Sequence, residues 1–277
     1  MSFDALVLPA LASPGPDAAA TERGPAPDRY CRIDHGFLYA SARLPDVSTQ
    51  RPSAVLLLGV SPRVQFGVAA GDGPLRQTGA ALVRPLVQRR LQAAGAALVS
   101  LNLHPAHAQF LHGCAIGGDG VLTLPRAAFQ AHDGALHALA AGMPDRASGQ
   151  ALADALLATL VPLLPPVPAE PPLRATLLQW LAQQPELALA ELAQRLGVSY
   201  HRMSHLFSQA IGIGYRQWRA FARAQRAAAQ FKAPGTLTGI AHDAGFADSA
   251  HLSHTWQRTY GLSPSFVRHD NSVQAIF

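Results

Sequence analysis

The chain has 277 residues, 49% of them hydrophobic, and a formal net charge of +5 at pH 7. This length is sufficient for two domains with separate cores, and no apolar run approaches the roughly 20 residues that cross a bilayer. The acidic Asp4 and the early Ser13-Pro14 pair argue against a secretory signal peptide, so we expect a cytoplasmic protein that does not enter the membrane.

The charge is unevenly distributed along the chain. Residues 1–172 carry 12 arginines and 12 acidic residues, whereas residues 173–277 carry 10 basic and 5 acidic residues. The C-terminal part therefore holds the positive excess, which would attract a polyanion such as DNA.

The N-terminal half begins with a lead-in, residues 1–28, whose Pro-, Ala- and Gly-rich composition predicts a poorly ordered segment. Short apolar or alternating runs follow, separated by turns that contain Gly and Pro. This pattern is typical of a β-barrel or β-sandwich. The runs predict strands within Tyr30–Ala40, Ala54–Gly59, Arg63–Val68, Ala80–Val83 and Ala97–Leu103.

After Pro125 the apolar pattern takes a helical period, which predicts helices over Arg126–Ala141 and Gln150–Leu164. The second helix carries a leucine stripe that must be buried against the sheet, a second subunit, or both, and we expect it to be a homodimer contact. A Pro-rich segment then marks a domain boundary. The predicted division is a first domain at residues 29–165, a linker at 166–172 and a second domain at 173–271.

One pattern occurs twice in the second domain: a short helix, a Gly-containing turn and a second helix. In the first copy Gly197 ends a helix and Ser199 caps the next one, and in the second copy Gly245 and Asp248 take these places. The repeat predicts two helix-turn-helix motifs, whose second helices enter the DNA major groove. Further helices are expected over Leu173–Gln183 and Tyr215–Phe231.

The stretch from Gly245 to Arg268 resembles the C-terminal signature of the AraC/XylS family of transcription regulators, and the first copy is similar to that family through Leu-Gly-Val-Ser at 196–199. The resemblance implies an α+β multidomain fold, with a cupin-like β-barrel and flanking helices before an all-α DNA-binding domain. It also implies an unknown small-molecule effector for the barrel, and double-stranded promoter DNA, RNA polymerase and a second copy of the chain as partners.

Two departures from the family pattern affect the expected DNA contacts. His205 and His254 stand where the family usually carries Arg, and Gly239 stands where it usually carries Glu. A histidine makes a single hydrogen bond to a base edge, whereas an arginine can bond guanine through two atoms. We therefore expect a weaker preference for guanine than the family pattern implies.

The two recognition helices carry the candidate DNA-binding residues. Met203 and Leu206 are expected to pack inward from the first helix, and Leu252 and Trp256 from the second. The candidates are the remaining, outward residues of each helix: His201, Arg202, Ser204, His205, Ser249, Ala250, His251, Ser253 and His254.

Four arginines recur on the helix that connects the two motifs. They could contact phosphates, but we favour a solvated face whose stems cover aromatic side chains. These residues are Arg216, Arg219, Arg223 and Arg226.

The sequence also leaves other classes of protein open. His104, His107, His112 and Cys114 could hold a metal ion, but their spacing matches no metal motif, and we expect no metal, cofactor or catalytic residue. The alternative functions are a metal-dependent cupin enzyme, or a methyl-transfer repair protein that uses Cys31 or Cys114, fused to a DNA-binding domain. A structural DNA-binding protein without an effector is a third possibility.

Overall fold

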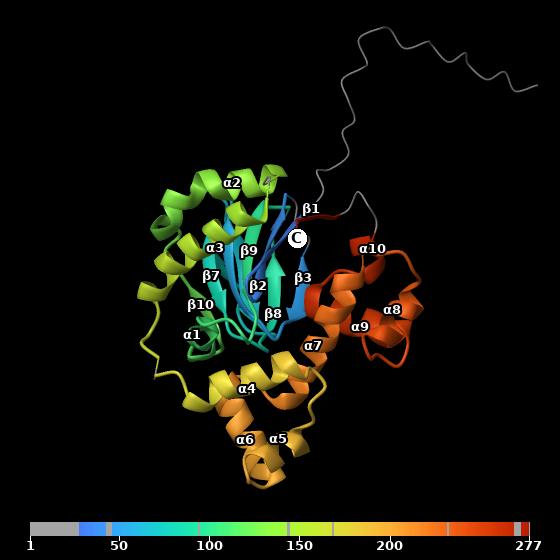
Figure 1. Cartoon of the computed structure of the whole chain (residues 1–277). Helices are drawn as coiled ribbons and strands as arrows, with labels where there is room; N and C mark the ends of the chain where they lie inside the picture. The colour runs from blue at the N-terminus through green and yellow to red at the C-terminus, as the bar shows by residue number, and fades with distance from the viewer. Residues whose placement is uncertain are drawn as a thin grey trace, which may run out of the picture.

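The computed structural model describes residues 28–42, 46–93, 95–142, 145–167, 169–231, 233–268 and 273–276. The expected lead-in lies outside the described residues, apart from Asp28. The described chain forms a sheet-rich N-terminal domain with flanking helices, followed by a helical domain (Figure 1). This architecture confirms the predicted fold class.

The strands divide between two sheets. Within the described residues, seven strands follow the order β10-β7-β4-β9-β2-β1-β11, and four follow the order β3-β8-β5-β6. Neighbours are antiparallel except β1 and β11, which run parallel. The bounds are β1 (Asp28–Ile33), β2 (Gly36–Ser41), β3 (Val47–Gln50), β4 (Ala54–Gly59), β5 (Phe66–Ala70), β6 (Arg76–Thr78), β7 (Ala80–Val83), β8 (Gln88–Gln92), β9 (Leu98–Leu103), β10 (Val121–Thr123) and β11 (Val273–Ile276).

The strand predictions were most accurate where a run is short and apolar throughout. The bounds of β4 and β7 agree with the predicted runs. The run predicted over Tyr30–Ala40 is instead a hairpin of two strands, because the chain turns at Asp34 and His35 and His35 adopts a left-handed φ of 52°.

Strand β4 shows how the larger sheet buries both of its faces. Leu56 and Leu58 pack with the helices that cover one face, whereas Val55 and Leu57 pack with Phe66 of the smaller sheet. All six residues of β4 are buried. The sequence of a strand that is covered on both sides is continuously apolar, whereas that of a strand with one exposed side alternates between apolar and polar residues.

The helices of the N-terminal domain lie over the outer face of the larger sheet (Figure 1). Asp145 caps α3 by accepting a hydrogen bond from the Ser148 amide at 2.7 Å, so this helix begins before the predicted start and ends at Leu160. The elements are α1 (Phe110–Cys114), η1 (Arg126–His132), α2 (Asp133–Gly142), α3 (Arg146–Leu160) and η2 (Val161–Leu163).

The leucine stripe of α3 is buried inside the chain itself. Leu156 and Leu160 are 0% and 2% exposed and belong to the same core as Leu38 and Leu101 of the sheet. The stripe is therefore not the homodimer contact that the sequence suggested, because the larger sheet already covers it.

The C-terminal domain contains two units that differ in how they are packed. Leu177, Leu192 and Phe207 belong to a core that is continuous with the N-terminal domain, whereas Ile240 and Leu252 belong to a separate core. Among the described helices, none has the length and apolarity that a bilayer crossing requires. The bounds are α4 (Pro172–Gln183), α5 (Leu189–Arg195), α6 (Tyr200–Ile211), α7 (Tyr215–Gln230), α8 (Leu237–Asp243), α9 (Ser249–Tyr260) and α10 (Pro264–Arg268).

Candidate nucleic-acid interface and ligand cavity

The two helix-turn-helix units, α5-α6 and α8-α9, share one turn geometry. Gly197 and Gly245 adopt left-handed φ values of 63° and 84°. In each unit the glycine amide and the next amide donate to carbonyls at the end of the preceding helix, at 2.8–3.1 Å. Ser199 then accepts from the Arg202 amide at 3.2 Å, and Asp248 from the His251 amide at 2.7 Å. The predicted turns and caps are thereby confirmed in both units.

The first recognition helix, α6, has a clear inner side. Met203 and Phe207 are completely buried, while Leu206, which was also expected to point inward, is half-buried. The outward side carries the expected polar residues, of which Ser204 is half-buried and the others are exposed: His201, Arg202 and His205. The rings of His201 and His205 lie 4.6 Å apart on this side.

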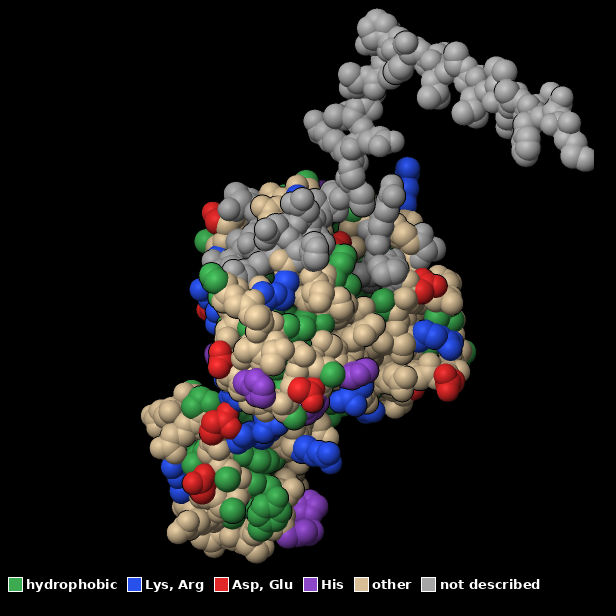
Figure 2. Space-filling view, turned by 90° about the vertical axis from the view of Figure 1, so that its right-hand side faces the viewer, with side chains coloured by type: hydrophobic (Ala, Val, Ile, Leu, Met, Phe, Trp, Pro, Cys, Tyr) green, Lys and Arg blue, Asp and Glu red, His purple; other side chains and the backbone are tan. Residues whose placement is uncertain are grey.

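The second recognition helix, α9, has the same division. Leu252 and Trp256 are 0% and 6% exposed and face the core. The ring of His251 lies against Phe246, with centroids 5.3 Å apart, as expected for a residue at the side of the helix. The remaining candidates are Ala250 and His254, which are exposed, and Ser249 and Ser253, which are half-buried. Figure 2 shows histidine side chains on the lower lobe and on the body above it, on one face of the molecule.

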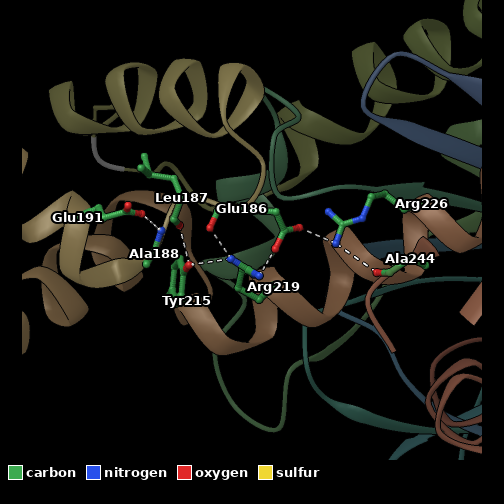
Figure 3. Close-up of polar contacts among 8 residues, drawn as sticks. All are labelled: Glu186, Leu187, Ala188, Glu191, Tyr215, Arg219, Arg226 and Ala244. Carbon is green, nitrogen blue, oxygen red and sulfur yellow. Dashed lines mark hydrogen bonds and ion pairs between the residues drawn. The ribbon is translucent and has the colours of Figure 1, made fainter. Parts of the chain in front are cut away.

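Two of the four arginines of α7, Arg219 and Arg226, link the two units, whereas Arg216 is exposed. Glu186, in the connection between α4 and α5, forms ion pairs with Arg219 and Arg226, the second at 2.7 Å (Figure 3). Arg219 also donates to the Glu186 carbonyl at 2.8 Å, and Arg226 to the Ala244 carbonyl, in the turn of the second unit, at 3.2 Å. One acidic side chain thus links the first unit, the connecting helix and the second turn.

Arg174 fastens the first recognition helix to the N-terminal domain. Its side chain is completely buried, and its terminal nitrogens donate to the carbonyls of Ala210 and Ile211, both at 3.2 Å, at the end of α6. The same guanidinium donates to the carbonyls of Pro105 and His107, at 2.6 and 3.0 Å, in the loop after β9. This arginine therefore joins the two domains through four backbone acceptors.

Arg51 makes the equivalent connection to the second recognition helix. Its guanidinium donates to the carbonyls of Thr259 and Tyr260, at 3.1 and 3.3 Å, at the end of α9. It also donates to Asn102 Oδ1 in β9 at 2.6 Å and lies 5.6 Å from the centre of the Tyr260 ring. Each recognition helix is thus held at its C-terminal end by one arginine that connects it to the N-terminal domain.

A cavity of about 200 Å³ lies between the sheets and the second unit. The N-terminal domain supplies apolar side chains and three arginines, and α7 and α9 supply further lining residues. No acidic side chain lines it among the described residues, and neither does any residue of α5 or α6. The charged and aromatic lining residues are Arg32, Arg51, Arg89, Tyr30, Phe37, Tyr39, Phe231, Trp256 and Tyr260.

Arg89 is the most unusual residue of this cavity. It is 3% exposed, and its Nε and Nη1 atoms meet no hydrogen-bond acceptor among the described residues. Burial, and then the nearby charge of Arg51, hold the pKa of Arg89 well below its usual range. An uncompensated guanidinium in such a place is costly to stability.

Sequence reasoning did not identify three of these residues, Arg51, Arg89 and Arg174, and it also missed the exposed Tyr200 at the start of α6. Arg89 shares the inner face of β8 with Leu91, so a charge at an inward strand position was an available signal. Tyr200 is the first residue of α6, directly after the Ser199 cap, and is 62% exposed. Its place next to the predicted cap was the available signal for an exposed position.

The residues proposed for metal or methyl-transfer chemistry are not brought into a reactive arrangement. No group of three His, Cys, Asp or Glu side chains that could hold a metal ion occurs in the described parts of the chain. His104 is instead packed against the Phe221 ring, with centroids 4.7 Å apart, and burial lowers its pKa to about 3. Burial raises the pKa of Cys31 and raises that of Cys114 to about 12, whereas a nucleophilic thiol needs a lowered pKa.

Comparisons with known proteins agree with this division of the chain. Residues 192–270 match a family described as a helix-turn-helix domain. No match was found among curated protein sequences.

The whole chain is similar in fold to solved structures of ToxT from Vibrio cholerae. For an apo variant the TM-score is 0.58 at 9% identity, covering 87% of this chain and 99% of that one. For the wild-type protein with a bound unsaturated fatty acid the TM-score is 0.54 at 9% identity, covering 86% and 96%. For ToxT bound to a methylnaphthalenyl butenoic acid it is 0.53 at 10% identity, covering 83% and 96%. At such identities the likeness establishes the shared two-domain fold.

Proposed function

We propose that this chain, whose residues 192–270 form a helix-turn-helix domain of the AraC type, is a transcription regulator controlled by a small molecule. The observation that carries the proposal is the repetition of one turn geometry before two helices, α6 and α9, that each present an exposed polar side. In such motifs the second helix lies in the major groove, and two units on one domain reach successive grooves roughly 34 Å apart.

The proposed base and phosphate contacts are made by the outward residues of these helices. On α6 they are His201, Arg202, Ser204 and His205, and on α9 they are Ser249, Ala250, His251, Ser253 and His254. The exposure of the histidines and their place after the turn support this assignment. A neutral histidine donates or accepts one hydrogen bond at a base edge, so His205 and His254 would determine sequence preference more than bulk affinity.

The cavity beside the second unit is the proposed effector site. Its lining is largely apolar with a few polar groups, as is typical of small-molecule sites. The ToxT structures with a bound unsaturated fatty acid or an aryl butenoic acid support a small-molecule effector for a chain of this fold.

Regulation rather than catalysis is the function we infer. The raised pKa values of Cys31 and Cys114 argue against methyl transfer, and the packing of His104 against Phe221 argues against a metal site there. RNA polymerase is the proposed protein partner and the cytoplasm the proposed location, because both follow from action at a promoter.

A homodimer formed through the N-terminal domain remains part of the proposal, with a different surface from the leucine stripe. The outer side of α3 is free of the sheet and carries small side chains, Ala151 and Ala158, beside Asp154. Small residues allow a second helix to approach closely. Replacing Ala158 with arginine should shift the mass in sedimentation from dimer to monomer, and a wild-type monomer at all micromolar concentrations would exclude this assembly.

Selection of bound sequences from randomised DNA tests the central proposal. The full chain should enrich a site with two half-sites about one helical turn apart, and its affinity should fall linearly with salt on logarithmic axes because Lys and Arg displace counterions. Enrichment of no sequence, or a salt-independent affinity, would contradict a sequence-specific regulator.

The same selection with His205→Ala and His254→Ala tests the assigned contacts. Each variant should lose preference at one or two base positions, worth about 1 kcal/mol, and keep the salt slope, since a neutral histidine releases no counterion. His242→Ala is the matched control, because His242 is exposed but lies on α8, outside the recognition helices. Unchanged preference in both test variants would show that the two histidines do not contact bases.

A further inference from the structure

The most exposed of the large hydrophobic side chains that the structure describes lies on the first recognition helix. Tyr200 is 62% exposed, whereas Leu163 and Phe266 are 38% and 39% exposed. The ring of Tyr200 belongs to none of the hydrophobic cores formed by the described residues. In Figure 2, hydrophobic side chains are exposed beside histidines on the lower lobe, which contains this helix. A single exposed apolar side chain is common on protein surfaces, so exposure identifies a partner only together with position in the motif.

Tyr200 is placed at the start of α6 by the turn before it. Ser199 accepts a hydrogen bond from the Arg202 amide at 3.2 Å and caps the helix, so Tyr200 is its first residue. The N-terminal residues of a recognition helix are the ones that reach base edges in the major groove. His201 follows directly, and its ring centroid lies 4.6 Å from that of His205 on the outward side. Tyr200 therefore adjoins the histidines that are proposed to contact bases.

The other outward residues of α6 provide hydrogen bonds and charge. They are His201, Arg202, Ser204 and His205, which suit the polar edges of the bases. The ring of Tyr200 adds a flat apolar body at the same end of the helix. Among the four bases, thymine alone has an apolar group, its methyl, on the major-groove edge. Contact between the ring and this methyl would remove apolar surface of both from water.

We propose that Tyr200 is a specificity-determining residue whose ring contacts the methyl group of a thymine in the half-site bound by α6. The proposal rests on the proposed function, and it adds a base preference that the polar contacts of the helix do not supply. The contact uses the ring and not the hydroxyl, so phenylalanine at this position should serve equally well.

The second recognition helix has no aromatic side chain at the corresponding place. Asp248 caps α9 as Ser199 caps α6. The first residue after the cap is therefore Ser249, in the place of Tyr200. Ser249 is half-buried, and its carbonyl accepts a hydrogen bond from the Ser253 hydroxyl at 2.8 Å. The proposed contact thus belongs to the first unit alone, and it would make the two half-sites unequal in their demand for thymine.

Binding to DNA in which uracil replaces thymine tests the contact, because this replacement removes the methyl group and leaves the hydrogen-bonding edge unchanged. The probe is the site that the full chain selects from randomised DNA, with uracil at one thymine at a time. At one position uracil should weaken binding of the wild type by about fourfold, which corresponds to one buried methyl group. Tyr200→Ala should bind the thymine and uracil forms of that position equally.

Three further variants separate the ring from its surroundings. Tyr200→Phe keeps the ring and should retain the difference between thymine and uracil, whereas Tyr200→Ser copies the residue of the second unit and should lose it. Phe266→Ala is the matched control, because Phe266 is a partly exposed aromatic residue on α10, outside the recognition helices, and should leave the difference unchanged. The Tyr200 variants should melt at the temperature of the wild type, since this side chain lies outside the described cores.

The contact is refuted by a selected site without a fixed thymine, or by equal uracil effects in the wild type and Tyr200→Ala. Loss of the thymine preference in Tyr200→Phe would also overturn it, because the hydroxyl would then make the contact. Each of these results comes with a selected DNA sequence and leaves the proposed function intact. Selection of no sequence at all would contradict the proposed function itself, and the contact with it.

Discussion

The two helix-turn-helix units have the same turn and different surroundings. In the first unit the helices share one continuous core with the sheets, and Arg174 is completely buried between them. The second unit has its own core and meets the sheets across a cavity, with Arg51 as the connection. Turn geometry therefore fixes how a recognition helix leaves its motif, whereas packing beyond the motif determines how firmly that helix is attached to the rest of the protein.

Removing the attachment of the first unit should have the largest effect on the stability of the protein. Arg174→Met leaves four backbone carbonyls without their donor in a buried place and should lower the free energy of unfolding by about 3–5 kcal/mol. Urea unfolding measures it. Arg146→Met is the control, since the ion pair of Arg146 with Asp34 is exposed and should contribute less than about 1 kcal/mol. Equal effects of the two substitutions would contradict the difference in attachment.

Acid should have the next largest effect on the free energy of unfolding. The group responsible is His104, which follows β9 and packs against Phe221 of α7. His104 is half-buried against the Phe221 ring, its Nε2 atom is sealed from solvent, and desolvation lowers its pKa to about 3. The unfolded chain therefore binds a proton near pH 6.5 that the folded chain does not bind until about pH 3. Stability should therefore fall as the pH drops through this window, by about 2 kcal/mol between pH 7 and 5.

His104→Phe removes the titrating group and should flatten this part of the pH dependence measured by chemical unfolding. His137→Gln is the control, because His137 is exposed on α2. A His104→Phe profile as steep as that of the wild type would show that other groups cause the acid sensitivity.

Removing the attachment of the second unit should have a smaller effect on stability, and that effect should be confined to the second unit. Arg51→Met removes the donors to the last carbonyls of α9 and should cost about 1–2 kcal/mol locally. Amide hydrogen exchange should accelerate in α9 and remain unchanged in α6. Acceleration in both helices would show that the two units are coupled more tightly than their separate cores indicate.

Substitutions of the turn glycines should have the smallest effects on stability, and these effects should be equal in the two units. Gly197→Ala and Gly245→Ala each force a left-handed φ on a residue with a Cβ, at a cost of about 1–2 kcal/mol in thermal unfolding. Gly239→Ala should have the opposite sign and stabilise by up to about 1 kcal/mol, since Gly239 is exposed inside α8 with only the Thr236 hydroxyl near the new Cβ, at 3.5 Å. Unequal costs at the two turns would mean that the units differ locally as well as in their surroundings.

The features that could be predicted from the sequence are those encoded by neighbouring residues. Gly197 with Ser199, and Gly245 with Asp248, contain a complete helix stop and helix start within a few positions, so both turns were predicted correctly. The strand β4 was recognisable because six consecutive residues are apolar. The outward and inward sides of α6 and α9 followed from helical periodicity, apart from the half-buried Leu206.

The contacts that join the domains could not be predicted in this way. Arg51 and the carbonyls of α9 are more than 200 positions apart, and the partners of Arg174 come from two separate segments, so no local pattern records them. For the same reason the leucine stripe of α3 identified a buried face without identifying the sheet that covers it. The predicted division into a first domain at residues 29–165 and a second at 173–271 stays a prediction, and the core shared through Leu177 and Phe207 is the reason to test whether the second domain folds alone.

Strand β11, which follows the second unit, has a mechanical consequence. It pairs in parallel with β1 through the register Asp28 to Val273, at the edge of the larger sheet (Figure 1). The helical domain is therefore connected to the sheet domain at both of its ends. The chain enters it from the sheet domain before α4, and after α10 the chain returns to the sheet as β11. A segment held at two points keeps a high effective concentration near its docking surface. The helical domain therefore cannot separate from the sheets unless the pairing of β11 with β1 is lost as well.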